Sequence, residues 1–197
     1  MGGLSVDRID AAQARDHIEM IDRILAESQP RLWAGGEFFV IWGTAAAYIT
    51  ILFQLVNVGV VGSATLWSVP FVIAGCTVYS IVRGRAMQSG IARTSLVQRE
   101  FFNVLWLTLG LAFVVNVAAF RLFPGIAGAA IWSVAQAIVL LYIGIHGNRR
   151  AQIAGILVVA SLVVANFVAP SLSAYVLAAG MLAGYTGFGV SELLSRD

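Results

Sequence analysis

Residues 38–56 read FFVIWGTAAAYITILFQLV, a stretch without a single charged side chain. A helix needs about 20 apolar residues to cross the hydrocarbon core of a bilayer, with about 17 as the lower limit. Backbone amides in hydrocarbon need partners within the segment, and this stretch is apolar on all sides instead of alternating as a barrel strand would. The stretch therefore predicts a transmembrane α-helix.

Five further stretches have the same character and contain no Asp, Glu, Lys or Arg. They are residues 64–82, 101–120, 126–145, 153–169 and 172–190, the fifth of the six spans being the shortest. The connections on one side of the membrane are very short. The pattern predicts an all-α fold, in which residues 33–197 form a six-helix transmembrane bundle built from three helical hairpins.

The composition of the whole chain agrees with lipid as its solvent. Of its 197 residues, 59% are hydrophobic and 11% are charged. Soluble domains carry about 25% charged residues. A chain with so few charges lacks the polar side chains that would cover a water-soluble globule, which excludes that class.

The positions of the arginines predict the direction of the spans. All 12 basic residues are arginine, and 11 of them fall on one side of the predicted membrane. Those 11 are Arg8, Arg15, Arg23, Arg31, Arg83, Arg85, Arg93, Arg99, Arg149, Arg150 and Arg196, with Arg121 alone on the other side. Because basic residues favour the cytoplasmic side, both termini are expected in the cytoplasm, which requires an even number of spans.

Residues 1–32 form a separate cytoplasmic segment, in which residues 5–28 are expected to be one amphipathic helix. Ile18, Ile21 and Leu25 lie at helical spacing. The helix carries six acidic residues against three arginines, whereas helices that lie on membrane surfaces are usually basic. We expect its apolar stripe to meet protein. A cytoplasmic or membrane partner, a second copy, and the protein's own bundle all remain open.

The first four spans contain a candidate internal repeat. Glu37-Phe38-Phe39 opens the first span and Glu100-Phe101-Phe102 opens the third. Trp67-Ser68-Val69 lies in the second span and Trp132-Ser133-Val134 in the fourth. Both halves run in the same direction, as in parallel repeats about the membrane normal. Chance within an apolar, low-complexity chain is the competing explanation.

Four amide side chains are the candidates for a polar site within the membrane. Gln54, Asn116 and Asn166 lie late in the three outward-running spans, and Gln136 lies near the middle of the fourth. One interpretation is a ring of amides that binds a small polar solute. The other, which we favour, is hydrogen bonding between helices, because amides commonly hold membrane bundles together.

A second group of candidates lies at the cytoplasmic ends of the spans. Its members are Glu37, Glu100, Arg83, Arg85, Arg149 and Arg150. The two acids stand at helix N-termini, where the helix dipole favours negative charge, so capping and ion pairing explain them better than proton transfer. The arginines are expected to contact anionic lipid headgroups.

Small residues recur in the last span. Gly180 and Gly184 form a Gly-x-x-x-Gly motif, which allows two helices to approach closely. The motif is compatible with a contact inside the bundle or with the interface of a homo-oligomer.

The entry to the first span carries a resemblance. The run Arg31-x-x-x-Gly35-Gly36-Glu37-Phe38-Phe39-x-x-Trp42-Gly43, followed by Arg93-Thr94 and Phe101-x-x-x-Leu105-Trp106, resembles an uncharacterised group of bacterial six-span membrane proteins with a cytosolic N-terminal helix. The resemblance covers about the first 110 residues. It implies a location in the bacterial inner membrane and implies no activity.

The residue types do not indicate an enzyme. The spans contain no carboxylate pair, nucleophile–base pair or metal-binding cluster, so we expect no catalytic, cofactor, metal or nucleic-acid site. The leading hypothesis is a non-enzymatic membrane protein that acts through protein interactions, a regulatory role included. The alternative is a small-solute transporter, channel or transporter subunit with a polar site between the hairpins.

Overall fold

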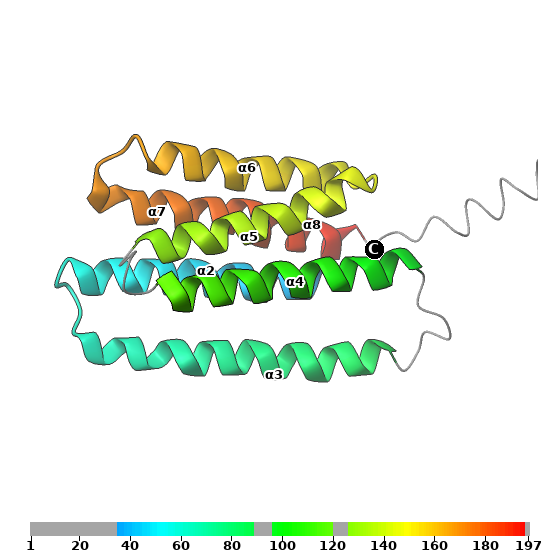
Figure 1. The fold of residues 1–197 in the computed structure, drawn as a ribbon, viewed down its shortest axis with the longest axis horizontal. Coiled ribbons are helices and arrows are strands. Elements are labelled where there is room, and N and C mark those ends of the chain that lie inside the picture. Colours follow the sequence, from blue (N-terminus) through cyan, green and yellow to red (C-terminus); the bar gives the residue numbers. More distant parts are fainter. Residues whose placement is uncertain (1–34, 89–95, 120–125, 196–197) are drawn as a thin grey trace, which may run out of the picture. The chain divides into compact units, whose positions relative to one another are not determined.

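The computed structural model of the protein describes residues 35–88, 96–119 and 126–195, and every regular element within these ranges is helical (Figure 1). The chain divides into two compact units, Met1–Trp33 and Ala34–Asp197. The helix expected over residues 5–28 lies outside the described residues. All described helices belong to the second unit.

The described residues of the second unit form six helices, four of which are long and apolar enough to cross a membrane. In chain order the elements are α2 (Gly36–Asn57), the short 3-10 helix η1 (Ser63–Trp67), α3 (Ser68–Gln88), α4 (Leu96–Ala119), α5 (Ile126–Ile145), α6 (Arg149–Ala165), α7 (Pro170–Met181), the π-helical turn η2 (Leu182–Thr186) and α8 (Gly187–Leu194). The last three elements are continuous. The four candidate spans are Gly36–Asn57, Ser63–Ala86, Ala127–Ile145 and Pro170–Leu194.

The predicted stretches 38–56 and 126–145 agree with α2 and α5 to within two residues, and the other helices differ from their predicted stretches by four to six residues at one end or both. The fourth stretch, predicted over 126–145, coincides with α5. The start of α6 is four residues earlier than predicted, because Asn148 caps it. The Asn148 Oδ1 atom accepts a hydrogen bond from the backbone N–H of Ala151 at 3.1 Å, which satisfies one of the free amides of the first turn.

The other end of α6 corrects two expectations. The predicted span reached residue 169, but α6 ends at Ala165 and Asn166 is its C-cap. Pro170, which lies between the predicted stretches 153–169 and 172–190, is the first residue of α7. A proline is favoured there because the first helical N–H has no partner within the helix. Asn166 therefore lies at the end of a helix and not within a span.

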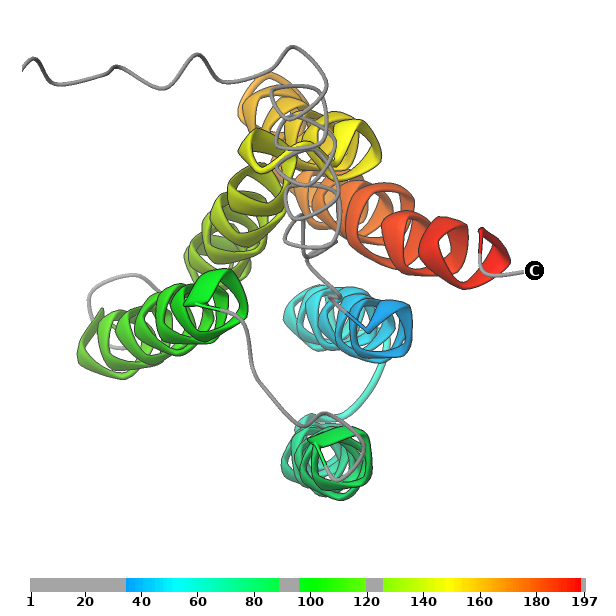
Figure 2. The ribbon, with the colours of Figure 1, turned by 90° about the vertical axis from the view of Figure 1, so that its right-hand side faces the viewer.

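The buried centre is shared by α2, α5, α6 and the continuous helix α7–η2–α8 (Figure 2). In the described part of the chain, α3 packs mainly on α2, and α4 packs mainly on α5. Burial differs accordingly: 56% of the apolar window of the last helix is buried, against 6% of the window of α3. The second and third helices thus expose most of their side chains.

Glycines allow the central helices to approach closely. A Cβ atom added to Gly36 would lie 2.5 Å from the carbonyl oxygen of Gly189, and one added to Gly189 would lie 2.5 Å from that of Gly36. Gly180 and Gly184 face Ser161 and Val158 of α6. The Gly-x-x-x-Gly motif therefore forms a contact inside the bundle.

The two halves of the candidate repeat take different places. Glu37-Phe38-Phe39 lies on the central α2, whereas the matching triplet lies on α4, which is mostly exposed. Trp67 is 72% exposed in η1, and its counterpart Trp132 is half-buried in α5. The duplication stays a prediction from the sequence.

Candidate functional site

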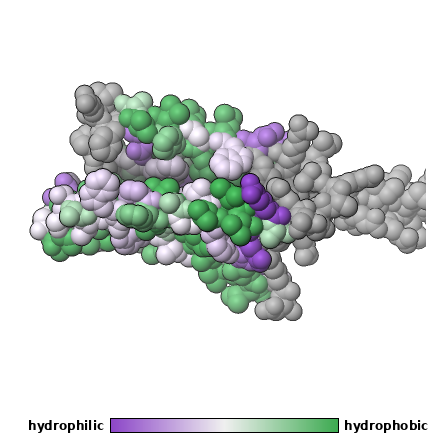
Figure 3. Space-filling view, turned by 90° about the horizontal axis from the view of Figure 1, so that it is seen from below, coloured by the Kyte–Doolittle hydropathy of each residue, from purple (hydrophilic) through white to green (hydrophobic). Residues whose placement is uncertain are grey.

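Charged side chains gather at one end of the bundle. The helices α2, α4 and α6 begin there, and α3 and α8 end there (Figure 1). The charged side chains that the structure describes are Glu37, Arg83, Arg85, Glu100, Arg149, Arg150 and Glu192. In Figure 3 the most hydrophilic colour on the displayed face also lies at one end. The six residues proposed for the cytoplasmic rim therefore belong to the same end, which is the candidate site.

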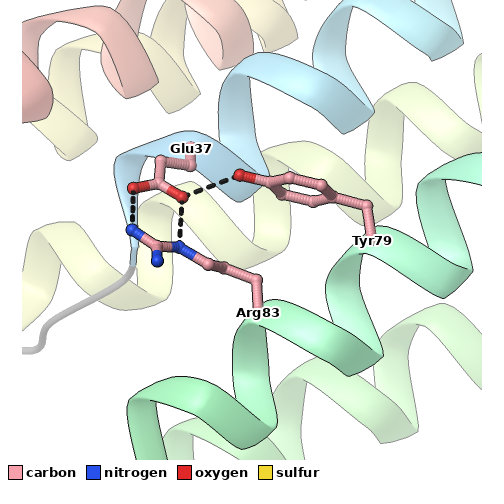
Figure 4. A network of polar contacts seen from close by, with 3 residues as sticks. All are labelled: Glu37, Tyr79 and Arg83. Carbon is pink, nitrogen blue, oxygen red and sulfur yellow. Dashed lines mark hydrogen bonds and ion pairs between the residues drawn. The ribbon is translucent and has the colours of Figure 1, made fainter.

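The best-defined cluster at this end joins α2 to α3 (Figure 4). Arg83 donates from Nε to Oε2 of Glu37 and from Nη2 to Oε1, both at 2.9 Å. The hydroxyl of Tyr79 donates to Oε2 at 2.8 Å. A two-point contact between guanidinium and carboxylate holds both groups in a fixed orientation. Glu37 therefore helps to attach α3, which supports the ion-pair interpretation of this residue over proton transfer.

Two more polar contacts follow along the same pair of helices. The indole N–H of Trp42 donates to Ser80 Oγ at 3.0 Å. The hydroxyls of Tyr48 and Ser68 lie 2.9 Å apart at the opposite end. Because little of the surface of α3 is buried, its position on α2 depends strongly on these hydrogen bonds.

A second cluster at the charged end joins α6 to α8. Besides capping α6, Asn148 donates from Nδ2 to Oε1 of Glu192 at 3.0 Å. Arg150 donates from Nη1 to the carbonyl oxygen of Ser191 at 3.2 Å. The neighbouring Arg149 is exposed. This cluster thus ties the start of α6 to the end of the last helix and leaves two arginines at the surface.

Two of the four amides form hydrogen bonds between helices. Gln54 is 8% exposed, and its Nε2 donates to the carbonyl oxygen of Ser171 at 3.1 Å, which joins α2 to α7. Asn116 of α4 donates from Nδ2 to the carbonyl oxygen of Gly128 on α5 at a long 3.4 Å. Both amides are used in packing, each at a different pair of helices.

The remaining two amides differ from each other. Asn166 is exposed and donates to the carbonyl oxygen of Leu162 in its own helix at 2.7 Å. Gln136 is 5% exposed, and its Oε1 atom has no hydrogen-bond partner within the described part of the chain. The same holds for Oγ1 of Thr186 in η2. Gln54, Asn116 and Asn166 thus donate hydrogen bonds to three separate backbone carbonyls and form no common site. Among the four amides, Gln136 is the one whose buried oxygen has no partner in the described part of the chain.

Comparison of the chain with family models, curated proteins and solved structures found no match.

From the sequence, Glu37 and Arg83 were separate candidates and not a pair, and Tyr79 was not a candidate. The position of the connection after α2 would have paired Glu37 with Arg83. Glu37 and Arg83 lie equally far from Val60, the middle of that connection, so an antiparallel hairpin brings them together. The link between Asn148 and Glu192 carries a similar signal, because both residues lie 22 positions from Pro170, which follows the connection between α6 and the last helix.

Proposed function

We propose that the chain is an integral protein of the bacterial inner membrane, in which all six helices cross the bilayer as three hairpins with both termini in the cytoplasm. Four helices have the length and composition for this. The other two are α6, with 17 residues, and α4, whose apolar part is Asn103–Ala118, both close to the lower limit of about 17 residues. The arginines at the charged end support a cytoplasmic location for that end.

A labelling experiment tests this topology. In a Cys76→Ser background, Val60→Cys places a thiol in the exposed connection after α2, and Ser195→Cys places one just beyond α8. A membrane-impermeant thiol reagent should label Val60→Cys on intact cells. It should label Ser195→Cys only after the membrane is opened. Labelling of Ser195→Cys on intact cells would overturn the proposal.

We further propose that the protein is not an enzyme and acts through protein interactions, with residues 5–28, over which the sequence predicts a helix, as its docking element. The observation that carries this proposal is the burial and hydrogen bonding of the Gln54 side chain. Its amide is nearly buried and is bonded to a backbone carbonyl, as expected of an amide that packs two helices and not of one that lines a solute path. The close glycine contacts of the central helices support the same interpretation.

Affinity purification from membranes tests the docking element. Partners should co-purify with the full chain and be lost when residues 1–30 are removed. A sharper variant replaces Ile18, Ile21 and Leu25 by serine, with Glu19→Gln, on the polar side of the predicted helix, as the control. If the serine variant retains every partner of the unaltered chain, this helix does not dock.

One observation favours the alternative of a small-solute transporter or channel. The Oε1 atom of Gln136 is buried near the middle of α5 without a partner, and buried polar atoms are normally paired. A polar solute that carries a hydrogen-bond donor could bind to this free acceptor atom. If Gln136→Leu abolishes uptake by cells or vesicles while thermal stability is kept, the transport hypothesis replaces the interaction hypothesis.

A further inference from the structure

A groove runs along the outer side of the bundle between α6 and the continuous last helix. Its volume is about 340 Å³, and it is open to the surroundings of the protein. The residues that line it are Arg150, Ile153, Ala154, Leu157, Ala183, Gly187, Phe188 and Ser191. Ala154 and Phe188 are 5% and 3% exposed and form its floor, while Ile153 and Leu157 stand exposed beside it.

The groove is polar at one end and apolar along the rest. Arg150 and Ser191 lie at the charged end of the bundle, and every other lining residue is apolar or glycine. From Arg150 to Leu157 the helix rises by about 10 Å, at 1.5 Å per residue. A ligand that fits must therefore carry a negative charge at one end and a hydrocarbon portion of about this length behind it.

The electrostatics at the charged end favour an anion. Arg150 uses one of its five N–H donors on the Ser191 carbonyl, and Arg149 is exposed next to it. The acid on this part of α8, Glu192, accepts a hydrogen bond from the neutral amide of Asn148 and keeps its charge, so that Arg149, Arg150 and Glu192 together carry a net charge of +1. Phosphate suits a guanidinium particularly well, because its oxygens match the fork of N–H donors.

The size of the groove favours a thin occupant. One turn of a helix about 10 Å wide and 5.4 Å long fills about 400 Å³. The groove offers about 340 Å³ over the roughly 10 Å from Arg150 to Leu157, a length in which two such turns would fill about 800 Å³. An extended hydrocarbon chain fits this space better than a helix of a second copy or a partner.

We propose that this groove is a binding site for one anionic glycerophospholipid, with its phosphate at Arg150 and an acyl chain along Ile153 and Leu157. The proposal rests on the proposed function in one respect, namely that the charged end faces the cytoplasmic leaflet, where anionic lipids are available. The lipid would cover the exposed apolar walls and join α6 to the last helix. It would therefore stabilise the pair of helices that the Arg150–Ser191 contact already connects.

Native mass spectrometry of the full chain in detergent micelles tests the site. Phosphatidylglycerol and phosphatidylcholine with identical acyl chains are titrated in parallel. We expect one phosphatidylglycerol to bind about fivefold more tightly than phosphatidylcholine, because the choline cation of phosphatidylcholine offsets the negative charge of its phosphate beside Arg150. Equal binding of the two lipids, or a dimer that excludes them from the groove, would overturn the proposal.

Variants separate the headgroup contact from the groove. Arg150→Gln should reduce phosphatidylglycerol binding to the level of phosphatidylcholine, whereas Arg150→Lys should keep part of the preference. Ala183→Phe fills the groove and should weaken both lipids. Arg85→Gln, an exposed arginine at the same end on α3, is the matched control and should change nothing. Equal losses in Arg85→Gln and Arg150→Gln would show a general charge effect and refute a site.

The lipid-binding test does not depend on a single variant or on the other two experiments. If Arg150→Gln does not fold, Arg150→Lys and Ala183→Phe still test the headgroup and the groove. Because the lipid measurement uses no partner protein and no cell, it can fail while the topology and docking experiments succeed. The converse is also true: labelling of Ser195→Cys on intact cells would refute the topology and leave micelle binding measurable.

Discussion

Gly189→Ala is the substitution whose effect follows most directly from the packing. The added Cβ atom would lie 2.5 Å from the carbonyl oxygen of Gly36 and 2.7 Å from the backbone nitrogen of Val40. Both are backbone atoms of α2 and cannot rotate away as a side chain would. The helices α2 and α8 must therefore separate to accommodate a single methyl group.

The magnitude follows from two opposing terms. Overpacking of a tight contact costs about 1–3 kcal/mol, whereas glycine to alanine within a helix gains up to about 1 kcal/mol. Gly75 on α3 supplies the control, because a Cβ atom there meets nothing within 4 Å. Gly75→Ala should therefore show only the gain in helix stability, without an overpacking cost. The two variants should therefore differ by about 1–3 kcal/mol, the overpacking cost.

Thermal unfolding of the full chain in detergent micelles measures this difference. For a chain of 150–250 residues, 1 kcal/mol corresponds to about 2–4 °C, so Gly189→Ala should melt about 2–12 °C below Gly75→Ala. Helical circular dichroism and the fluorescence of the five tryptophans should report the same transition. If Gly189→Ala melts at or above Gly75→Ala, α2 and α8 do not cross at these glycines.

Three further predictions concern polar contacts. Gln54→Leu should lower the free energy of unfolding by about 0.6–1.5 kcal/mol, because the hydrogen bond to the Ser171 carbonyl is lost. Asn166→Leu is the control and should have little effect, because the Asn166 side chain donates within its own helix. Equal melting temperatures for the two variants would contradict this prediction. Asn148→Ala should cost about 1 kcal/mol by removing the cap of α6, seen as faster hydrogen exchange in its first turn, and unchanged exchange there would rule out the cap. Glu37→Gln should speed hydrogen exchange in α3 while α5 stays unchanged, because α3 loses its ion pair; a uniform change in all helices would refute a local role.

Much of the helix layout could be predicted because the bilayer imposes a local rule. Every residue in a span has to tolerate hydrocarbon, so the span can be recognised from the stretch itself, and α5 coincides with its predicted bounds. The ends of α6 were missed because they depend on single residues. Asn148 and Pro170 carry the signals for a cap and a first turn, but hydrophobicity alone outweighed them in the prediction.

The candidate site could be predicted only in part. The rim residues could be named from the sequence because charge is confined to the ends of the predicted spans. The amides could be named too, but their hydrogen bonds could not be assigned. Whether Gln54 faces a solute or a carbonyl depends on where α7 begins, which is more than one hundred residues away in the chain.

By itself, the sequence determined that the chain is helical and suited to lipid, and which ends of its helices carry charge. Only the tertiary structure decided which helices lie at the centre, which partner Glu37 takes, and that a groove ends at Arg150. The reason is that hydrophobicity is similar on every side of these helices and so does not distinguish one neighbour from another. In a membrane that choice depends on small residues and hydrogen bonds between distant segments, such as Gly36 with Gly189, and these pairs meet only after the chain has folded.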